Sequence, residues 1–126
     1  MSATVLLVDD DPDILENEAY ILHTAGYRVL TADSFSAAVK CIGEIRPDLA
    51  VIDIGLPDGD GVELGWLLRG AGIPFIIVSA TSLRIDVERS LTAGARDYLL
   101  KPVPATELIE RVGVVVGACP PVAPQV

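Results

Sequence analysis

Five side chains that can do chemistry each follow a short apolar run of the chain. They are Asp9, Asp10, Asp53, Ser79 and Lys101. Carboxylates gathered in one pocket repel each other, and a hard divalent cation relieves that repulsion. Mg²⁺ suits such a pocket because it prefers a few carboxylates together with waters and a phosphate oxygen. The residue types therefore indicate a magnesium-dependent phosphoryl-transfer site.

Each of these residues has a role that its chemistry allows. The Asp53 carboxylate would attack phosphorus and form an acyl phosphate, a covalent intermediate of several phosphotransfer systems. The Lys101 ammonium is a mobile point charge for one phosphoryl oxygen, and the Ser79 hydroxyl can donate a hydrogen bond to another. A cation held by the aspartates would attract the phosphodonor and neutralise the charge that develops during transfer.

Each of these residues could instead have a purely structural role. The acidic stretch Asp9–Asp11 could cap a helix near its positive dipole end. Asp53 could be an ordinary acid at a strand end, although the apolar run before it would bury an unpaired charge, which is unfavourable. Ser79 could satisfy only backbone groups, and Lys101 could be a surface lysine.

Short apolar runs alternate with helical patterns along nearly the whole chain. The runs that we expect to form strands cover residues 5–8, 27–31, 49–54, 75–78 and 98–100. The helical patterns lie between them, and a last one begins at Pro104. Strict alternation of this kind predicts an α/β fold with a five-stranded parallel sheet that is covered on both faces. Right-handed crossovers make the sheet doubly wound.

The predicted sheet explains how residues that are distant in sequence could form one site. In an open α/β sheet, ligands bind beyond the carboxyl ends of the strands. Asp53 lies near the end of a predicted strand and the other four candidate side chains follow predicted strands, so all five should converge at this edge. His23, the only histidine, lies in the first helical pattern and away from the strand ends, and we expect it to be packed or solvated.

The helix caps and the inward helix faces can also be predicted. We expect Asp11 and Asp60 to cap the first and third helices. Trp66 and Phe75 are expected in the core, and Cys41 should act as a small hydrophobe. Apolar residues at helical spacing mark the inward faces: Leu15, Ala19, Leu22, Ala38, Cys41, Ile42, Ile45, Leu64, Leu67, Leu68, Val87, Leu91, Leu108, Val112, Val115 and Val116.

The composition limits the domain organisation and the compartment. The chain has 126 residues, of which 51% are apolar, so we expect one domain at 1–118 and a proline-rich tail or linker at 119–126. The net charge of −9 would repel nucleic acid phosphates. The charge-free stretch 112–126 is too short and too rich in proline to cross a membrane. Cys41 and Cys119 form no close pair, so the cytoplasm is the expected compartment.

Four segments of the chain resemble the signature segments of response-regulator receiver domains of bacterial two-component systems, including the chemotaxis regulators. The segments are Val5–Asp11, Asp53–Gly61, Ile77–Ala80 and Asp97–Pro102. They occur in the order and at the spacing that is typical of that family. The resemblance covers the chain from about residue 5 to 116 and implies a flavodoxin-like (βα)5 fold with strand order 2-1-3-4-5.

The resemblance also implies roles for the residues that handle the phosphoryl group. Asp53 matches the phosphoacceptor, and Lys101 matches the phosphate partner, whose bond to Pro102 is usually cis in the family. Ser79 matches the switch hydroxyl. Tyr98 matches the aromatic switch that turns inward when this hydroxyl moves to the phosphate, although core or edge packing is an alternative role.

The magnesium ligands follow from the same resemblance. Asp10 matches the direct ligand, Asp53 also contributes, and Asp9 matches the acid that acts through water. Gly55 matches the position whose backbone carbonyl completes the coordination by the protein. Gly55 lacks the longer side chain of many family members, and Thr81 is also small, so the lifetime of the phosphoryl group is left open.

The expected function is that of a receiver in a two-component phosphorelay. A histidine kinase or a histidine phosphotransfer protein would donate its phosphoryl group to Asp53. Phosphorylation would switch the surface of the fourth helix, fifth strand and last helix for partner binding or homodimerisation. Val114 would add apolar area there, and Arg89, Asp97 and Arg111 could add ion pairs. Self-phosphorylation and self-dephosphorylation would be its only catalysis.

Three other functions compete with this one. An aspartate-based phosphatase needs a second acid two residues after the nucleophile, where this chain has Gly55. A receiver-like protein that only binds partners would not need Asp10, Asp53 and Lys101. A flavin-binding protein of the flavodoxin type needs a glycine- or hydroxyl-rich phosphate loop after the first strand, where this chain has aspartates.

Overall fold

The computed structural model describes residues 2–118, and its main sheet has the predicted topology. The sheet is parallel with strand order β2-β1-β3-β6-β7. The strands are β1 (Thr4–Val8), β2 (Arg28–Ala32), β3 (Leu49–Asp53), β6 (Phe75–Ser79) and β7 (Asp97–Leu100). Because β4 and β5 form a separate hairpin, this order confirms the predicted order 2-1-3-4-5. The proline-rich tail predicted at 119–126 lies outside the described residues.

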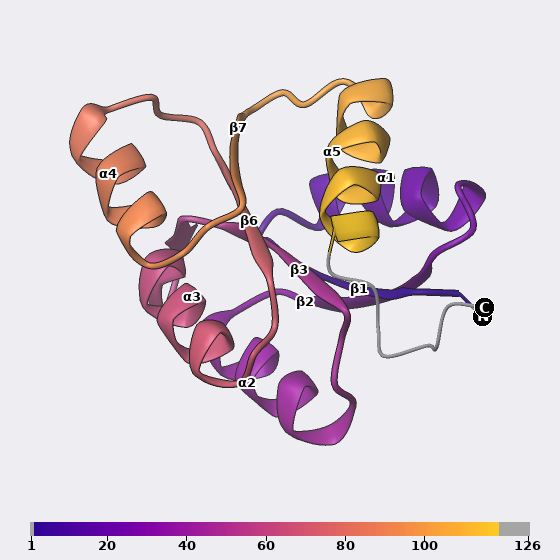
Figure 1. Ribbon diagram of the computed structural model, residues 1–126, viewed down its shortest axis with the longest axis horizontal. Helices are drawn as coiled ribbons and strands as arrows, with labels where there is room; N and C mark the ends of the chain where they lie inside the picture. The colour runs from indigo at the N-terminus through magenta and orange to yellow at the C-terminus, as the bar shows by residue number, and fades with distance from the viewer. Residues whose placement is uncertain (1, 119–126) are drawn as a thin grey trace.

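Five helices cover the two faces of the sheet (Figure 1). Helices α1 (Pro12–Thr24) and α5 (Ala105–Ala118) lie together on one face. Helices α2 (Phe35–Glu44), α3 (Gly61–Gly70) and α4 (Arg84–Thr92) lie on the other. Within residues 2–118, none of these helices has the length and apolar character that crossing a membrane requires.

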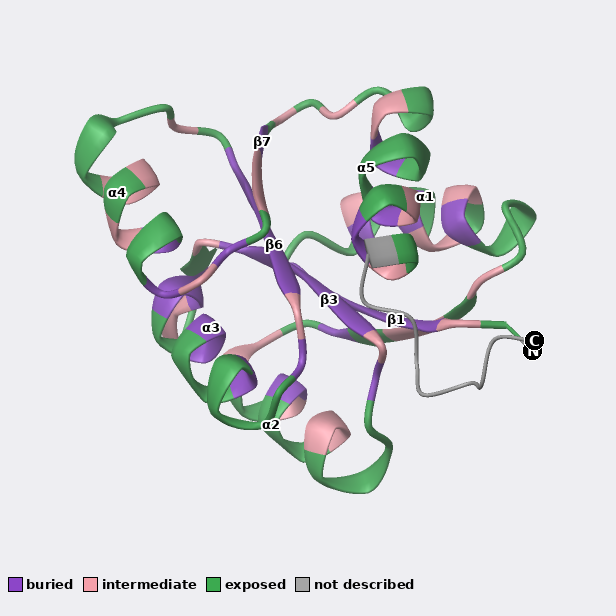
Figure 2. Ribbon diagram, in the orientation of Figure 1, coloured by how far each residue is buried: buried purple, intermediate pink, exposed green. Residues whose placement is uncertain are grey.

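The core has two layers because successive residues of a strand face opposite sides of the sheet. In β1, Leu6 and Val8 pack in the layer under α2 and α3, whereas Val5 and Leu7 pack in the layer under α1 and α5. Figure 2 shows the central strands as the most continuously buried part of the molecule. Each large apolar side chain that is fully buried contributes about 1.5–3 kcal/mol, so the strand ends rest on a rigid support.

The helix caps at Asp11 and Asp60 are confirmed. Asp11 accepts hydrogen bonds from two backbone N–H groups in the first turn of α1, the shorter at 2.9 Å. Asp60 accepts one from the backbone N–H of Val62 at 2.8 Å. These caps satisfy N–H groups that have no partner within the helix. Helix α4 starts after Leu83 without a side-chain cap.

Four side chains that were predicted to face the core are exposed. In α3, the buried face centres on Gly65, because the Phe75 ring packs where a Cβ would stand. Helix α4 turns Ser90 inward, so its neighbour Leu91 faces solvent. Helix α2 ends at Glu44, one residue before Ile45, which was its last predicted core position. Trp66 is 48% exposed and has the Arg69 guanidinium 5.4 Å from its ring centre. The four exposed side chains are Ile45, Trp66, Leu67 and Leu91.

Candidate functional site

Three aspartates and one lysine meet at the carboxyl edge of the sheet. Asp9 and Asp10 directly follow β1, Asp53 ends β3, and Lys101 directly follows β7. One carboxylate oxygen from each aspartate lies within 4.8 Å of the others. The Lys101 Nζ atom lies 2.7 Å from Asp9 Oδ2 and 3.3 Å from Asp53 Oδ2. The structure thus brings together residues that are up to 92 positions apart, as the strand-end rule predicts.

Burial divides the aspartates into two that are enclosed and one that faces solvent. Asp9 and Asp53 are only 3% and 8% exposed, whereas Asp10 is exposed. Taking carboxylates out of water is costly unless they are paired. The Lys101 ammonium supplies that pairing, and Asp10 leaves the cluster open on one side.

The charges in this cluster shift the pKa values of the acceptor and the lysine. Burial raises the pKa of Asp53, the Lys101 charge lowers it, and the negative charge of Asp9 raises it further, so the net shift is upward. Burial lowers the pKa of Lys101, but the hydrogen bond to Asp9 and the negative charges of Asp53 and Asp9 together raise it. Lys101 is therefore a permanent ammonium at neutral pH.

The donor set of the site fits Mg²⁺. Three carboxylates that converge from two strand ends offer hard oxygen ligands. A dication also resolves the repulsion between Asp9 and Asp53, which the single Lys101 charge offsets only in part. Gly55 lies two residues after the acceptor, and its N–H faces Asp53 Oδ1 at 3.4 Å. The ligand roles of its carbonyl and of an Asp9-bound water stay predictions.

A short hairpin follows the acceptor and is fixed to helix α2. It consists of β4 (Gly55–Leu56) and β5 (Gly59–Asp60), which pair in antiparallel fashion. In the turn between them, Asp58 accepts hydrogen bonds from the backbone N–H groups of Phe35 at 2.7 Å and Ser36 at 3.0 Å. These bonds lower the pKa of the Asp58 carboxyl. The sequence analysis did not predict this connection between the hairpin and α2.

The backbone of the acceptor itself packs against a glycine. A Cβ atom at Gly61 would overlap with the carbonyl oxygen of Asp53 and with the Cα atom of Ile54. The Gly61 N–H donates to the Ile54 carbonyl at 2.9 Å. The first residue of α3 thus sets the position of the strand end that carries the acceptor.

Ser79 and Tyr98 are joined through the backbone of Thr81. Ser79 is 1% exposed at the end of β6, and its Oγ atom accepts a hydrogen bond from the Thr81 N–H at 3.1 Å. The Tyr98 hydroxyl donates to the Thr81 carbonyl at 2.7 Å. A displacement of Ser79 would therefore act on the same peptide segment that holds Tyr98. The Lys101–Pro102 bond is cis, as predicted.

Sequence reasoning missed one buried acidic side chain whose pKa responds to the charges of this cluster. Glu18 lies on α1 and is buried. Burial, which is the largest effect, and the charge of Asp9 raise its pKa to about 7, while Lys101 opposes this shift and Asp53 adds to it. The signal was available in the sequence, because Glu18 lies at helical spacing between the predicted core residues Leu15 and Leu22.

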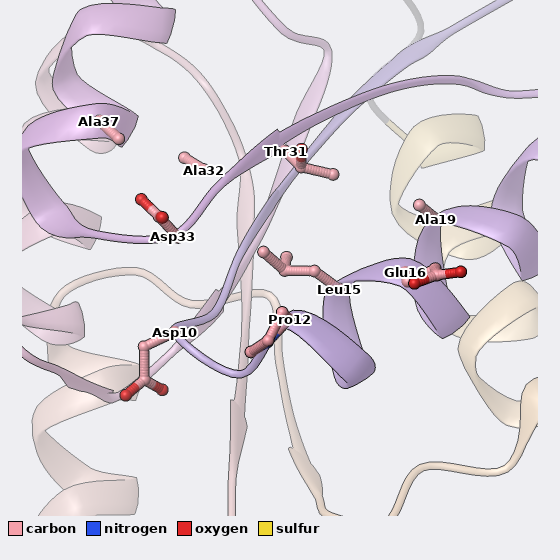
Figure 3. A pocket seen from close by; sticks show the side chains of 9 residues that line it. All are labelled: Asp10, Pro12, Leu15, Glu16, Ala19, Thr31, Ala32, Asp33 and Ala37. Carbon is pink, nitrogen blue, oxygen red and sulfur yellow. The ribbon is translucent and has the colours of Figure 1, made fainter.

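A solvent-open hollow of about 630 Å³ adjoins the cluster (Figure 3). It lies between the start of α1, the end of β2 and the start of α2, and Asp10 is the one metal-site residue in its lining. Asp33 and Glu16 also line it. Asp10 therefore joins the cluster that holds the buried Asp53 to an open surface.

Comparisons with known proteins agree with this geometry. The model of the response regulator receiver domain matches residues 5–113. The chain belongs to the response regulator receiver family. A receiver domain described as CheY-like, from Methanospirillum hungatei, superposes with a TM-score of 0.90 at 32% identity, covering 94% of this chain and 96% of that chain. The fold and the resemblance to chemotaxis regulators are thereby confirmed.

Two curated relatives of this receiver domain are longer proteins. The transcriptional regulatory protein KdpE of Mycobacterium tuberculosis is 38% identical over 108 residues, which are 85% of this chain and 48% of KdpE. The DNA-binding response regulator MtrA of Mycolicibacterium smegmatis is 34% identical over 113 residues, 89% of this chain and 50% of MtrA. The receiver domain thus spans about half the length of these relatives.

Proposed function

We propose that this receiver accepts a phosphoryl group on Asp53 with the help of Mg²⁺. The observation that carries the proposal is the convergence of one ammonium and three carboxylates at a single strand edge. Bound Mg²⁺ would supply a Lewis acid for the phosphoryl oxygens. Asp10, Asp53 and the Gly55 carbonyl would hold it directly, and Asp9 would hold it through water.

The side chains of the chain perform the remaining steps. An oxygen of Asp53 attacks phosphorus, a new O–P bond forms, and the bond from phosphorus to the donor breaks with its electron pair leaving on the donor. Lys101, which already lies 3.3 Å from Asp53, pairs with one phosphoryl oxygen. The Ser79 hydroxyl donates to another. Water later cleaves the acyl phosphate, so we expect no turnover of an external substrate.

We infer that the donor is a histidine kinase or a histidine phosphotransfer protein. Such a protein presents a phosphorylated side chain, so this receiver needs an opening through which that side chain can reach Asp53. Asp10 and the adjoining hollow provide the exposed side of the site. We place this exchange in the cytoplasm, the compartment expected from the sequence.

The output surface consists of α4, β7 and α5. Leu100 and Val114 are exposed apolar side chains on this surface, and Arg111 pairs with Asp97 at 2.9 Å. We propose that movement of Ser79 and Tyr98 changes this surface for a partner or for a second receiver. With a net charge of −9, this domain would act through proteins and not by contacting DNA itself.

Mass spectrometry after incubation with acetyl phosphate and Mg²⁺ tests the proposal. The wild-type chain should gain one phosphoryl group, and the Asp53→Asn variant should gain none. Asp33→Asn is the matched control, because it makes the same chemical change in the neighbouring hollow and should be phosphorylated like the wild type. An unmodified wild-type chain, or a phosphorylated Asp53→Asn variant, would show that the proposal is wrong.

A further inference from the structure

Three exposed arginines lie outside the acceptor site, on three separate connections of the fold. Arg46 lies between α2 and β3, Arg69 lies in the last turn of α3, and Arg96 directly precedes β7. The chain has 18 acidic and only 9 basic residues. A place where three of the basic residues gather would therefore be a local exception to the charge of the domain.

A hollow of about 370 Å³ brings these arginines together. Arg69 and Arg96 both line it, and no acidic residue is found in its lining among the described residues. Arg46 reaches its rim, because its guanidinium donates hydrogen bonds to the backbone carbonyls of Ala71 at 2.6 Å and of Gly72, a lining residue, at 3.1 Å. We call this feature the arginine hollow.

Two glycines leave space for the arginine side chains. Gly72 and Gly94 line the hollow and have φ angles of 74° and 100°. A Cβ atom would come within 3.2 Å of Arg46 Nη2 at Gly72 and within 3.3 Å of Arg69 Cδ at Gly94. Arg69 is held further by a hydrogen bond from Nη1 to the Thr92 carbonyl at 3.1 Å. The backbone of the loops thus sets where Arg46 and Arg69 lie.

The three arginines have no carboxylate partner in the part of the chain that the structure describes. None of the ion pairs between residues 2–118 includes Arg46, Arg69 or Arg96. A guanidinium carries five N–H donors, and the bonds to backbone carbonyls use two donors of Arg46 and one of Arg69. The remaining donors suit carboxylates, which a guanidinium binds through two parallel hydrogen bonds.

We propose that the arginine hollow is a docking site for an acidic segment of a partner protein. The guanidinium groups come from three separate connections, so several carboxylates on one peptide segment match them better than a single small anion does. An apolar side chain between these carboxylates would cover Ile73 and Pro74, which also line the hollow. A nucleic acid offers repeated negative charge too, but the net charge of −9 would repel it.

The arginine hollow lies at the opposite end of the sheet from Asp53. Phe75 begins β6 at the hollow, and Ser79 ends the same strand at the acceptor site. Four residue steps along a strand span about 13 Å. A partner could therefore dock there while the acceptor site is occupied, so the inference goes beyond the proposed function and does not depend on it.

Fluorescence anisotropy with two labelled peptides tests the proposal. The first peptide carries two glutamates on each side of a leucine, and the second carries glutamines in place of the glutamates. Arg69→Gln and Arg96→Gln each remove one guanidinium from an exposed position, so both variants should fold. Arg28→Gln is the matched control: it makes the same change of charge at an exposed position of β2, the strand at the other edge of the sheet.

We expect the glutamate peptide to bind the wild type and the glutamine peptide not to bind. Each single substitution in the hollow should weaken binding roughly two- to fivefold, as for exposed charge pairs, and the double variant by about tenfold. Arg28→Gln should bind like the wild type. Trp66, the only tryptophan of the chain, has the Arg69 guanidinium 5.4 Å from its ring centre, so its emission should change on binding. Inorganic phosphate should displace no more peptide than sodium chloride of equal ionic strength.

Three results would overturn the inference. The first is a wild-type chain that does not bind the glutamate peptide at about 1 mM. The second is binding that leaves the emission of Trp66 unchanged and that Arg28→Gln weakens as much as Arg69→Gln does, which would mean unspecific attraction. The third is displacement by phosphate beyond the effect of ionic strength, which would make the hollow a site for a small anion. Phosphorylation of Asp53 is measured separately in the same chains, so its failure would overturn only the proposed function.

Discussion

Lys101 is the counter-charge of the two buried carboxylates of the site. Its ammonium touches Asp9 and Asp53, so these two buried acids always have a counter-charge. Removing one partner of a buried ion pair is far more damaging than the pair is stabilising, because the remaining charge is left without compensation. The stability of the chain should therefore depend on Mg²⁺ when Lys101 is absent.

We expect Lys101→Met to lower the free energy of unfolding by on the order of 2 kcal/mol in the presence of a chelator. Methionine keeps the length of the side chain but leaves the carboxylates facing each other. Adding Mg²⁺ should stabilise this variant more than it stabilises the wild type, as measured by urea unfolding. Lys40→Met, at an exposed position of α2, is the control. An equal effect of Mg²⁺ on variant and wild type would contradict the prediction.

The raised pKa of Glu18 makes a separate prediction about stability and pH. The pKa rises from 4.5 to about 7 on folding, so the folded chain binds the proton more tightly than the unfolded chain does. Below about pH 4.5, Glu18 is protonated in both the folded and the unfolded chain, so its burial carries no charge. The free energy of unfolding then falls as the pH rises through about 7, where the buried carboxyl ionises.

Glu18→Leu removes this loss. In chelator, the gain in unfolding free energy over the wild type should be about 2 kcal/mol larger at pH 8 than at pH 4.5. Chemical unfolding at a series of pH values measures the difference. Glu44→Gln, at an exposed position of α2, should follow the wild type throughout. A variant whose advantage is the same at both pH values would argue against a buried, ionising Glu18.

Most of the site could be predicted residue by residue because its members follow strands. Asp53 and Lys101 lie at strand ends, where the α/β architecture alone gathers polar groups. Glu18 could not be assigned in this way, since a helix contributes it and its type argues against burial. The helical spacing placed it inward, but hydrophobic patterning counts only apolar residues and so passes over a buried acid.

At the scale of elements, the acceptor loop is held from two sides. Asp58 fixes the hairpin to the start of α2, and Asp60 both caps α3 and pairs with Arg89 of α4. The close contact between Gly61 and the Asp53 carbonyl completes the arrangement. These contacts leave the backbone around Asp53 little freedom, so the proposed phosphoryl transfer would use positions that are set before any ligand binds.

We expect Gly61→Ala to lower the free energy of unfolding by about 1–3 kcal/mol, the usual cost of forcing an extra methyl group into a packed region. Because the displaced atoms belong to the acceptor strand, the rate of phosphorylation by acetyl phosphate should fall as well. Gly43→Ala is the control: a Cβ there meets nothing within 4 Å, and it should stabilise α2 by about 0.5–1 kcal/mol. A Gly61→Ala chain with wild-type stability and rate would show that this contact is unimportant.

The elements themselves were largely predictable, but their inward faces were less so. The five parallel strands were predictable because short apolar runs alternate strictly with helical patterns along the chain. The β4–β5 hairpin was not predicted, because two-residue strands leave no periodic signal. Trp66 was expected in the core because it is large and apolar. Because Gly65 has no side chain, the Phe75 ring packs directly against this side of α3. Gly65 therefore faces the core, and the next residue, Trp66, faces outward.

At the scale of the whole molecule, the site lies at one edge and the proposed output surface lies on α4, β7 and α5. Val114 is 63% exposed there, as predicted. Of the three charged residues that could add ion pairs there, Asp97 and Arg111 pair with each other, and Arg89 pairs with Asp60 and Asp86. The surface therefore combines exposed aliphatic area with fixed charges, as interfaces that form reversibly often do.

We expect Val114→Glu to weaken phosphorylation-dependent dimerisation by at least about tenfold, because a dimer would have to bury the new carboxylate. Sedimentation velocity with Mg²⁺ and beryllofluoride, which mimics the phosphoryl group on aspartate, measures the association. Val39→Glu is the matched control, since Val39 is also an exposed aliphatic residue but lies on α2. Unchanged dimerisation of the Val114→Glu chain would exclude this surface as the dimer interface.

Helix α4 depends on Arg89 more than on apolar burial. Only Ser90 is buried in this helix, while Arg89 joins Asp60 and Asp86 through partly exposed ion pairs. Such pairs weaken as dissolved ions screen them, over a distance of about 10 Å at 0.1 M ionic strength. The packing of α4 against the rest of the domain would therefore weaken at high salt concentration. The same degree of phosphorylation would then give a different output at low and at high ionic strength.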